Sequence, residues 1–125
     1  MSIRNALFAL VMSTATMVAA GEAGPAVQRE INSLLSRLET SGCRFNRNGK
    51  WYAASEAKSH MLTKLHYIEN RTTLVSTEQF IELAGSKSSF SGKPYLVQCG
   101  DSPAQPSAVW LTTQLHLLRS ASQRP

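Results

Sequence analysis

The chain contains two cysteines, Cys43 and Cys99, and a bond between them would constrain the fold more than any other feature. In an oxidising compartment an even pair of cysteines is expected to be bridged. Closing a loop of nearly sixty residues stabilises a small domain by roughly 4 kcal/mol, as the unfolded chain loses entropy. The alternative is a redox-active pair, but the residues do not form a CxxC motif. We therefore predict a structural disulfide.

The first twenty residues are typical of a secretory signal peptide. Arg4 precedes an apolar or small-residue stretch from Ala6 to Ala20, which ends in small residues that suit signal cleavage. A membrane-spanning helix is the alternative, but it needs about 20 apolar residues, and this run is shorter and contains hydroxyl side chains. We predict cleavage after Ala20, export to the periplasm or the medium, and one domain over residues 21–125 without a membrane span.

Composition excludes some classes of protein. A hydrophobic share of 42% with 17% charged residues argues against a disordered chain. Loss of Arg4 leaves 12 basic side chains against 8 acidic ones, a net charge of +4. These charges are spread along the chain and do not form a basic cluster interleaved with aromatic residues, so we expect no nucleic-acid partner. Weak attraction to anionic envelope components fits this charge better.

A hairpin is predicted from Cys43 to Tyr52. Its centre, Asn48-Gly49, is the dipeptide that best adopts the positive φ angles of a type I′ turn, and aromatic residues flank it. A further short strand is expected from Tyr95 to Cys99, followed by a turn-rich linker from Gly100 to Pro106.

Four helices are predicted from apolar spacing and capping signals. The first runs from about Pro25 to Thr40, the second from about Ser55 to Asn70, and the third from a capping box at Ser76 to Gly85. Ser107 is expected to cap the last helix, and residues 120–125 form a polar tail. Most aromatic side chains are needed for the core of so small a domain: Phe45, Trp51, Tyr52, Phe80, Phe90, Tyr95 and Trp110.

These elements predict an α+β fold with a small antiparallel sheet, made of the hairpin plus one strand. About four helices would pack on it, and one disulfide would link the start of the hairpin to the end of the third strand. A mostly helical bundle decorated by a hairpin is the alternative.

The hairpin segment from Ser41 to Tyr52 resembles the central motif of the YfeK-like family. These are small exported bacterial proteins that contain a domain of unknown function. Further similarities lie on the second predicted helix, at Ser88 to Tyr95, at Cys99, and at Ser107 with Trp110 and Leu111; together they cover residues 27–119. The resemblance implies an exported domain with two cysteines in these places, and it brings no activity, substrate or catalytic residues.

The candidate ligand-binding residues include basic side chains on two elements. His60 and Lys64 are one helical turn apart, and Arg47 and Lys50 flank the predicted hairpin turn. Together they suit a cationic groove for a carboxylate or phosphate group. The alternative is a solvated helix face. The groove requires Arg47 and His60 to point to the same side of the domain.

A serine-rich loop follows the third predicted helix. It does not match a P-loop, because the glycine spacing is wrong and Pro94 follows Lys93. Neither GxSxG nor SxxK is present to support a catalytic serine. A role in recognition fits this loop better. Ser89, Ser91 and Lys93 would enter a cleft of a partner, as short Ser-Gly loops do in secreted lysozyme inhibitors.

We expect no metal and no cofactor, because the six-residue spacing of His60 and His66 puts them on different sides of a helix, where they do not face one ion. The sequence therefore favours a non-enzymatic exported binding module for a protein or an envelope component. Two alternatives stay open: a small envelope hydrolase that uses His60 with a loop serine, and an enzyme inhibitor that acts through residues 88–95. The oligomeric state is not predicted.

Overall fold

The hairpin forms where the sequence predicts it, and it organises one end of the molecule. In this computed structural model, which describes residues 9–12 and 21–124, β1 (Arg44–Arg47) pairs with β2 (Lys50–Ala53) across a two-residue turn. Asn48 and Gly49 have φ angles of 53° and 84°, the positive values that a type I′ turn needs. The predicted signal peptide and its cleavage after Ala20 concern residues that lie, except for residues 9–12, outside the described part.

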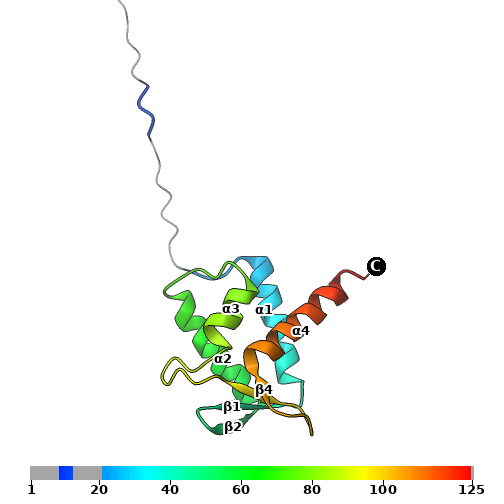
Figure 1. Cartoon of the computed structure of the whole chain (residues 1–125). Coiled ribbons are helices and arrows are strands. Elements are labelled where there is room, and N and C mark those ends of the chain that lie inside the picture. Colours follow the sequence, from blue (N-terminus) through cyan, green and yellow to red (C-terminus); the bar gives the residue numbers. More distant parts are fainter. Residues whose placement is uncertain (1–8, 13–20, 125) are drawn as a thin grey trace, which may run out of the picture.

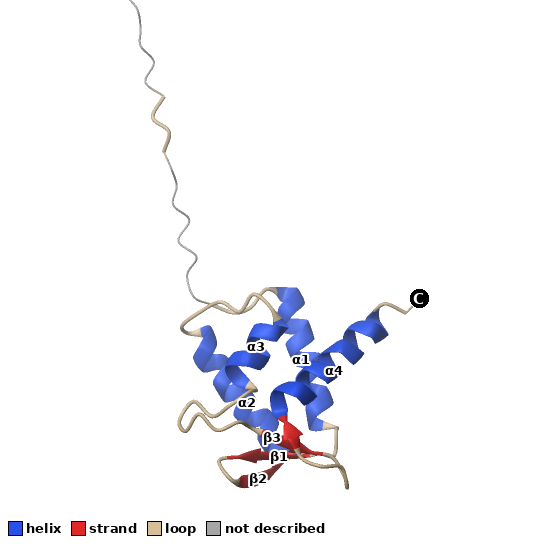
Figure 2. Ribbon diagram, viewed as in Figure 1, coloured by secondary structure: helices blue, strands red, loops and turns tan. Residues whose placement is uncertain are grey.

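The sheet has four antiparallel strands in the order β2-β1-β3-β4 (Figure 2). The predicted third strand is β3 (Leu96–Gln98), which pairs with β1. The prediction of a linker up to Pro106 was wrong at its end, because Gln105–Pro106 forms a short fourth strand, β4. Proline is tolerated there because β4 is an edge strand and one side of it needs no ladder bond.

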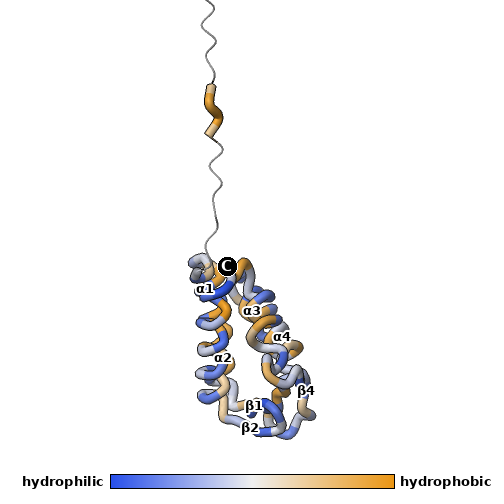
Figure 3. The backbone as a smooth tube through the Cα atoms, turned by 90° about the vertical axis from the view of Figure 1, so that its left-hand side faces the viewer, coloured by the Kyte–Doolittle hydropathy of each residue, from blue (hydrophilic) through white to orange (hydrophobic). Residues whose placement is uncertain are grey.

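Four helices among the described residues lie on one side of this sheet: α1 (Pro25–Glu39), α2 (Ala54–Glu69), α3 (Thr77–Ala84) and α4 (Ser107–Ser122). The sheet contacts α2 and α4, and α1 and α3 pack on those two helices. The α+β prediction is therefore confirmed. Figure 1 and the view turned by 90° in Figure 3 both place the sheet at one end of the molecule with the helices above it. The end of α4 that lies far from the sheet leads to the C-terminus of the chain (Figure 1).

The core lies between the helices and the inner face of the sheet. Strand alternation directs Phe45 and Val97 toward the helices, and Phe45 meets the ring of Trp110 edge-to-face at 5.7 Å between centroids. The predicted apolar stripe of α1 is buried, with Ile31 and Leu34 at 1% exposure or less. The outer face of the sheet instead carries exposed or half-buried side chains, including Arg44 and Trp51.

The predicted disulfide is confirmed, because the Sγ atoms of Cys43 and Cys99 are 2.05 Å apart. The bond lies at the end of β1 opposite to the hairpin turn, directly beyond the Arg44–Gln98 pair. It therefore fixes the register of β1 against β3.

Helix ends follow local signals, with two corrections. Ser76 caps α3 as predicted, because its Oγ accepts the Gln79 N–H at 3.1 Å, and the Gln79 side chain accepts the Val75 N–H. Ser107 was wrongly predicted as a cap: Pro106 holds that position and Ser107 is the buried first residue of α4. The last helix also continues to Ser122, past the predicted start of the polar tail.

Gly85 ends α3 as predicted, and close packing requires a glycine there. A Cβ atom at this position would lie 2.5 Å from Leu111 Cδ1 and 2.8 Å from Met61 Cε. The absent side chain thus lets α3 approach α2 and α4 closely.

Phe90 was wrongly predicted to belong to the core. Its side chain is 96% exposed at the tip of the segment from Ser86 to Tyr95, which we call the serine loop. This loop protrudes beside the sheet end of the molecule (Figure 1). The reason is local: the loop satisfies its own backbone polar groups and therefore does not fold back over the core.

Candidate functional site

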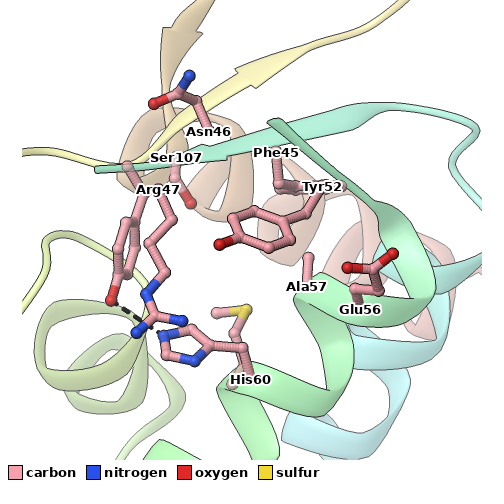
Figure 4. A pocket seen from close by; sticks show the side chains of 10 residues that line it. Phe45, Asn46, Arg47, Tyr52, Glu56, Ala57, His60 and Ser107 are labelled. Carbon is pink, nitrogen blue, oxygen red and sulfur yellow. Dashed lines mark hydrogen bonds between the residues drawn. The ribbon is translucent and has the colours of Figure 1, made fainter. Parts of the chain in front are cut away.

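A cavity of about 140 Å³ lies between the hairpin and α2. Its walls are apolar where Phe45, Ala57 and Met61 face each other, and polar groups surround this apolar part (Figure 4). A cavity of about 150 Å³ lined by apolar side chains is enough to bind one benzene molecule. The cavity therefore has room for a ring or a short branched alkyl group.

Secondary structure explains why these side chains meet. Alternation along β1 places Phe45 and Arg47 on the inner face, and antiparallel pairing sets Tyr52 directly opposite Phe45. On α2, helical spacing brings Ala57 and His60 to the same side, facing the hairpin. The sheet and the first turns of α2 thus build the cavity together.

Tyr95 connects the cavity to α2. Its hydroxyl lies 3.2 Å from His60 Nε2 and 3.2 Å from Lys64 Nζ. An ammonium group only donates, so the phenol oxygen accepts from Lys64, and its own hydrogen is then available for the imidazole. The His60 and Tyr95 rings also meet edge-to-face at 6.0 Å.

The surroundings disfavour the charged forms of His60, Lys64 and Tyr95. Burial lowers the pKa of His60, and the nearby Arg47 and Lys64 lower it further. Burial and then Arg47 also lower the pKa of Lys64. The pKa of the Tyr95 phenol is raised by burial, against an opposing effect of Arg47. A neutral imidazole that accepts from a neutral phenol agrees with all these directions.

Two polar groups at the cavity have no partner within the described chain. Arg47 makes no ion pair or hydrogen bond there, although its guanidinium lies next to His60 (Figure 4). The Ser107 side chain is 3% exposed and its hydroxyl faces the cavity without a hydrogen bond. Arg47 is half-buried and the Ser107 hydroxyl is accessible from the cavity, so both groups are available to a ligand there.

Glu56 is the acidic side chain of the lining. It is exposed, forms no ion pair with a described residue, and lies across the cavity from Arg47 (Figure 4). One side of the opening is therefore positive and the other negative.

The predicted site residues divide into two groups. Arg47 and His60 share the cavity, which meets the condition set for a cationic groove, and Lys64 adjoins them through Tyr95. Lys50 lies beside the cavity, with its Nζ 5.3 Å from the centroid of the Tyr52 ring.

Ser89, Ser91 and Lys93 do not line the cavity. They belong to the serine loop, which contacts the hairpin turn instead: the Ser91 hydroxyl donates to Asn48 Oδ1, and Asn48 Nδ2 donates to Ser88 Oγ at 3.2 Å. The tip of the loop thus extends the basic surface of the hairpin, and Tyr95 at its end is the loop residue that lines the cavity.

The sequence interpretation missed Tyr52, Tyr95 and Ser107 as parts of the site. The first two were assigned to packing, because an aromatic side chain in a strand most often packs. Ser107 was assigned to a helix cap. Strand alternation was the available signal. Phe45 and Arg47, two residues apart, lie on one face of β1, and Tyr52 lies opposite Phe45 on that same face.

His60 contacts Tyr95 through its Nε2. No hydrogen bond joins His60 to a serine in the described residues, and its Nε2 is engaged by Tyr95. Nor do the residues that the structure describes include three His, Cys, Asp or Glu side chains grouped as a metal would need. Across residues 9–12 and 21–124 no helix has the length and apolar character to span a membrane.

Comparison with known proteins places this chain in a family. Residues 25–119 match the family of unknown function DUF5329. The chain is also 39% identical over 69 residues to the uncharacterized protein YfeK of Salmonella typhimurium, a match that covers 54% of this chain and 56% of that protein. The chain thus spans little more than half the length of this curated relative. No solved structure matches it significantly. The chain belongs to the DUF5329 family, whose function is unknown.

Proposed function

We propose that this protein is an exported, non-enzymatic binding module that holds a small amphipathic anion in the cavity between the hairpin and α2. The ligand places an apolar group against Phe45 and Met61 and its carboxylate against Arg47. The observation that carries this proposal is the combination of an apolar cavity with an unpaired guanidinium at its edge. Such a combination of apolar walls and a few polar groups is typical of small-molecule sites.

Electrostatics favour an anion at Arg47. The groups around it are the cationic Lys64, the imidazole of His60 and the phenol of Tyr95, so its charge is not neutralised by a close carboxylate. A carboxylate that accepts from a guanidinium in a half-buried place gains a charge-assisted hydrogen bond, worth about 1.5–3 kcal/mol. The Ser107 hydroxyl gives the ligand a second polar contact deeper in the cavity.

Location in the periplasm is part of the proposal. It is supported by the signal-like sequence of residues 1–20 and by the disulfide, which is typical of proteins from oxidising compartments. The ligand is then a molecule of the cell envelope or one that enters it.

The proposal is tested with phenylacetate, whose ring matches the cavity volume and whose carboxylate is separated from the ring by one methylene group. Phenylacetamide has nearly the same shape without the charge. Titration calorimetry with the oxidised protein should show tighter binding of phenylacetate, and Arg47→Gln should weaken it about tenfold without changing phenylacetamide binding.

Arg44→Gln is the matched control. Arg44 lies on the same strand but on the outer face of the sheet, 5.7 Å from the Trp51 ring. If the two arginine variants weaken phenylacetate binding equally, the effect is one of net charge and the cavity is not the site. Ala57→Phe should fill the cavity and abolish binding of both compounds; unchanged binding in this variant would also contradict the proposal.

A further inference from the structure

The serine loop holds a phenyl ring in water, and its structure prevents the ring from folding away. Phe90 is 96% exposed, although burial of a large apolar side chain is favourable. The chain around it is closed by the Tyr95 N–H, which donates to the Ser86 carbonyl at 3.0 Å, and by the Ser88 N–H, which donates to the Lys93 carbonyl at 3.0 Å. Phe90 thus sits at the tip of a small closed loop.

Ser88 organises that tip from inside. Its side chain is 3% exposed, and its Oγ accepts from the N–H groups of Phe90 and Ser91 at 3.2 and 3.3 Å. The same oxygen accepts from Asn48, which ties the tip to the hairpin turn. At the base, Lys64 Nζ donates to the Lys87 carbonyl at 3.0 Å and ties the loop to α2. Because the loop is already ordered, it loses little further conformational entropy when it binds a partner.

The loop that carries Phe90 and the hairpin that it contacts are both basic. The hairpin segment 43–52 and the serine loop, which contact each other, contain no Asp or Glu. Between them they contribute these basic side chains: Arg44, Arg47, Lys50, Lys87 and Lys93. The direct neighbours of Phe90 in the chain are serines, so no second apolar side chain adjoins it in sequence to build the apolar core of a protein interface.

We propose that the serine loop is a membrane-docking element. Phe90 inserts into the interface of a bilayer, while Lys87 and Lys93 contact anionic phospholipid headgroups. A single aromatic ring at the tip of a convex loop, flanked by lysines, suits a lipid surface, because apolar burial and attraction to anionic lipid act together there. The inference does not depend on the cavity, which Lys87, Phe90 and Lys93 do not line.

The test is co-sedimentation of the purified protein, with its disulfide formed, with two kinds of vesicles. One is an equimolar mixture of phosphatidylglycerol and phosphatidylcholine, and the other is phosphatidylcholine alone. We expect binding to the anionic vesicles, weakened by salt. Phe90→Ala should reduce the fraction bound about tenfold, and Lys93→Gln about fivefold.

Val75→Ala is the matched control, because Val75 is another apolar side chain, 77% exposed, in a different loop. It should bind vesicles like the wild type. Equal binding by Phe90→Ala and the wild type, or no binding of the wild type to anionic vesicles, overturns the proposal. So does equal binding to both kinds of vesicles. Capture of a protein that Phe90→Ala fails to capture, without vesicle binding, would favour a protein partner instead. Because Phe90 is exposed, its variant should keep the melting temperature of the wild type, which serves as the folding check.

Discussion

The Tyr95 hydroxyl lies within hydrogen-bond distance of His60 Nε2, at 3.2 Å, and this contact joins α2 to the segment before β3. The imidazole has to be neutral at Nε2 to accept from the phenol. Protonation of His60 would remove this acceptor and add a cation beside Arg47 and Lys64. The contact therefore makes the fold sensitive to acid.

Stability should fall as the pH decreases below about 7. The pKa of His60 in the folded protein is lower than its ordinary value of 6.5, so the unfolded chain takes up a proton first as the pH falls. The lost stability is largest below the folded-state pKa. Urea unfolding between pH 7.5 and 5 should show this decline, and His60→Gln should flatten it. His66→Gln, on the exposed side of the same helix, is the control, and His60→Gln should flatten the pH profile more than this variant does.

Ligand binding should show the opposite trend with pH. An anion at Arg47 would lie close to His60 and would raise its pKa, so protons are taken up on binding. Phenylacetate should therefore bind more tightly at pH 5.5 than at pH 7.5, and the trend should disappear in His60→Gln. Phenylacetamide, which has no charge, is expected to show little pH dependence. A pH trend of the same size for both compounds would contradict the proposed place of the carboxylate.

The disulfide should supply a large part of the stability. Its loop, with a sequence separation of 56 residues, predicts a loss of roughly 4 kcal/mol in the free energy of unfolding when both cysteines are replaced by alanine. Reduced wild-type protein should unfold at the same urea concentration as that double variant. Unfolding curves that coincide with those of the oxidised wild type would show that the sheet holds its register without the bond.

Much of the fold was predictable because its signals are local. Asn48-Gly49 determines its own turn, and Ser76 with Gln79 determines the start of α3. The fourth strand was not predictable in the same way, because Gln105 and Pro106 are strand residues only through their pairing with β3. A two-residue strand has no periodicity of its own.

The site was partly predictable for a similar reason. Arg47 and His60 stand out as polar residues at defined positions of a hairpin and a helix, and the structure brings both to one cavity. Ser107 and Tyr95 join them through tertiary packing, including the Ser107 N–H, which donates to the Tyr95 carbonyl at 2.8 Å. Phe90 shows the opposite case, since the hydrogen bonds of Ser88 override the general preference of phenylalanine for a core.

Asn48 should control the order of the serine loop. Asn48→Gly keeps the positive φ angle of the turn but removes the side chain that bonds to Ser88 and Ser91. We expect a loss of about 1–2 kcal/mol in the free energy of unfolding and faster hydrogen exchange at the Phe90 and Ser91 amides. Ser89→Ala, at an exposed position in the same loop, is the control. Unchanged exchange in Asn48→Gly would show that the loop keeps its order without the hairpin.

Gly85→Ala should destabilise the protein by about 1–3 kcal/mol, because the new methyl group would overlap Leu111 and Met61 in the core. Gly21→Ala, where a Cβ atom would meet nothing within 4 Å, is the control and should be close to neutral. Urea unfolding of both variants measures the difference. Equal stability of the two would mean that the core side chains move aside without cost.

Gly85 also acts as a spacer for a site that it does not touch. Met61 lines the cavity on one side, and its Cε lies 2.8 Å from the place where a side chain at Gly85 would begin. Any side chain there would push the thioether toward the space that the ligand needs. The upper limit on the size of the proposed ligand is thus set in part by one absent methyl group behind the cavity wall. Enlarging residue 85 should narrow the choice of ligands without altering a residue that lines the cavity.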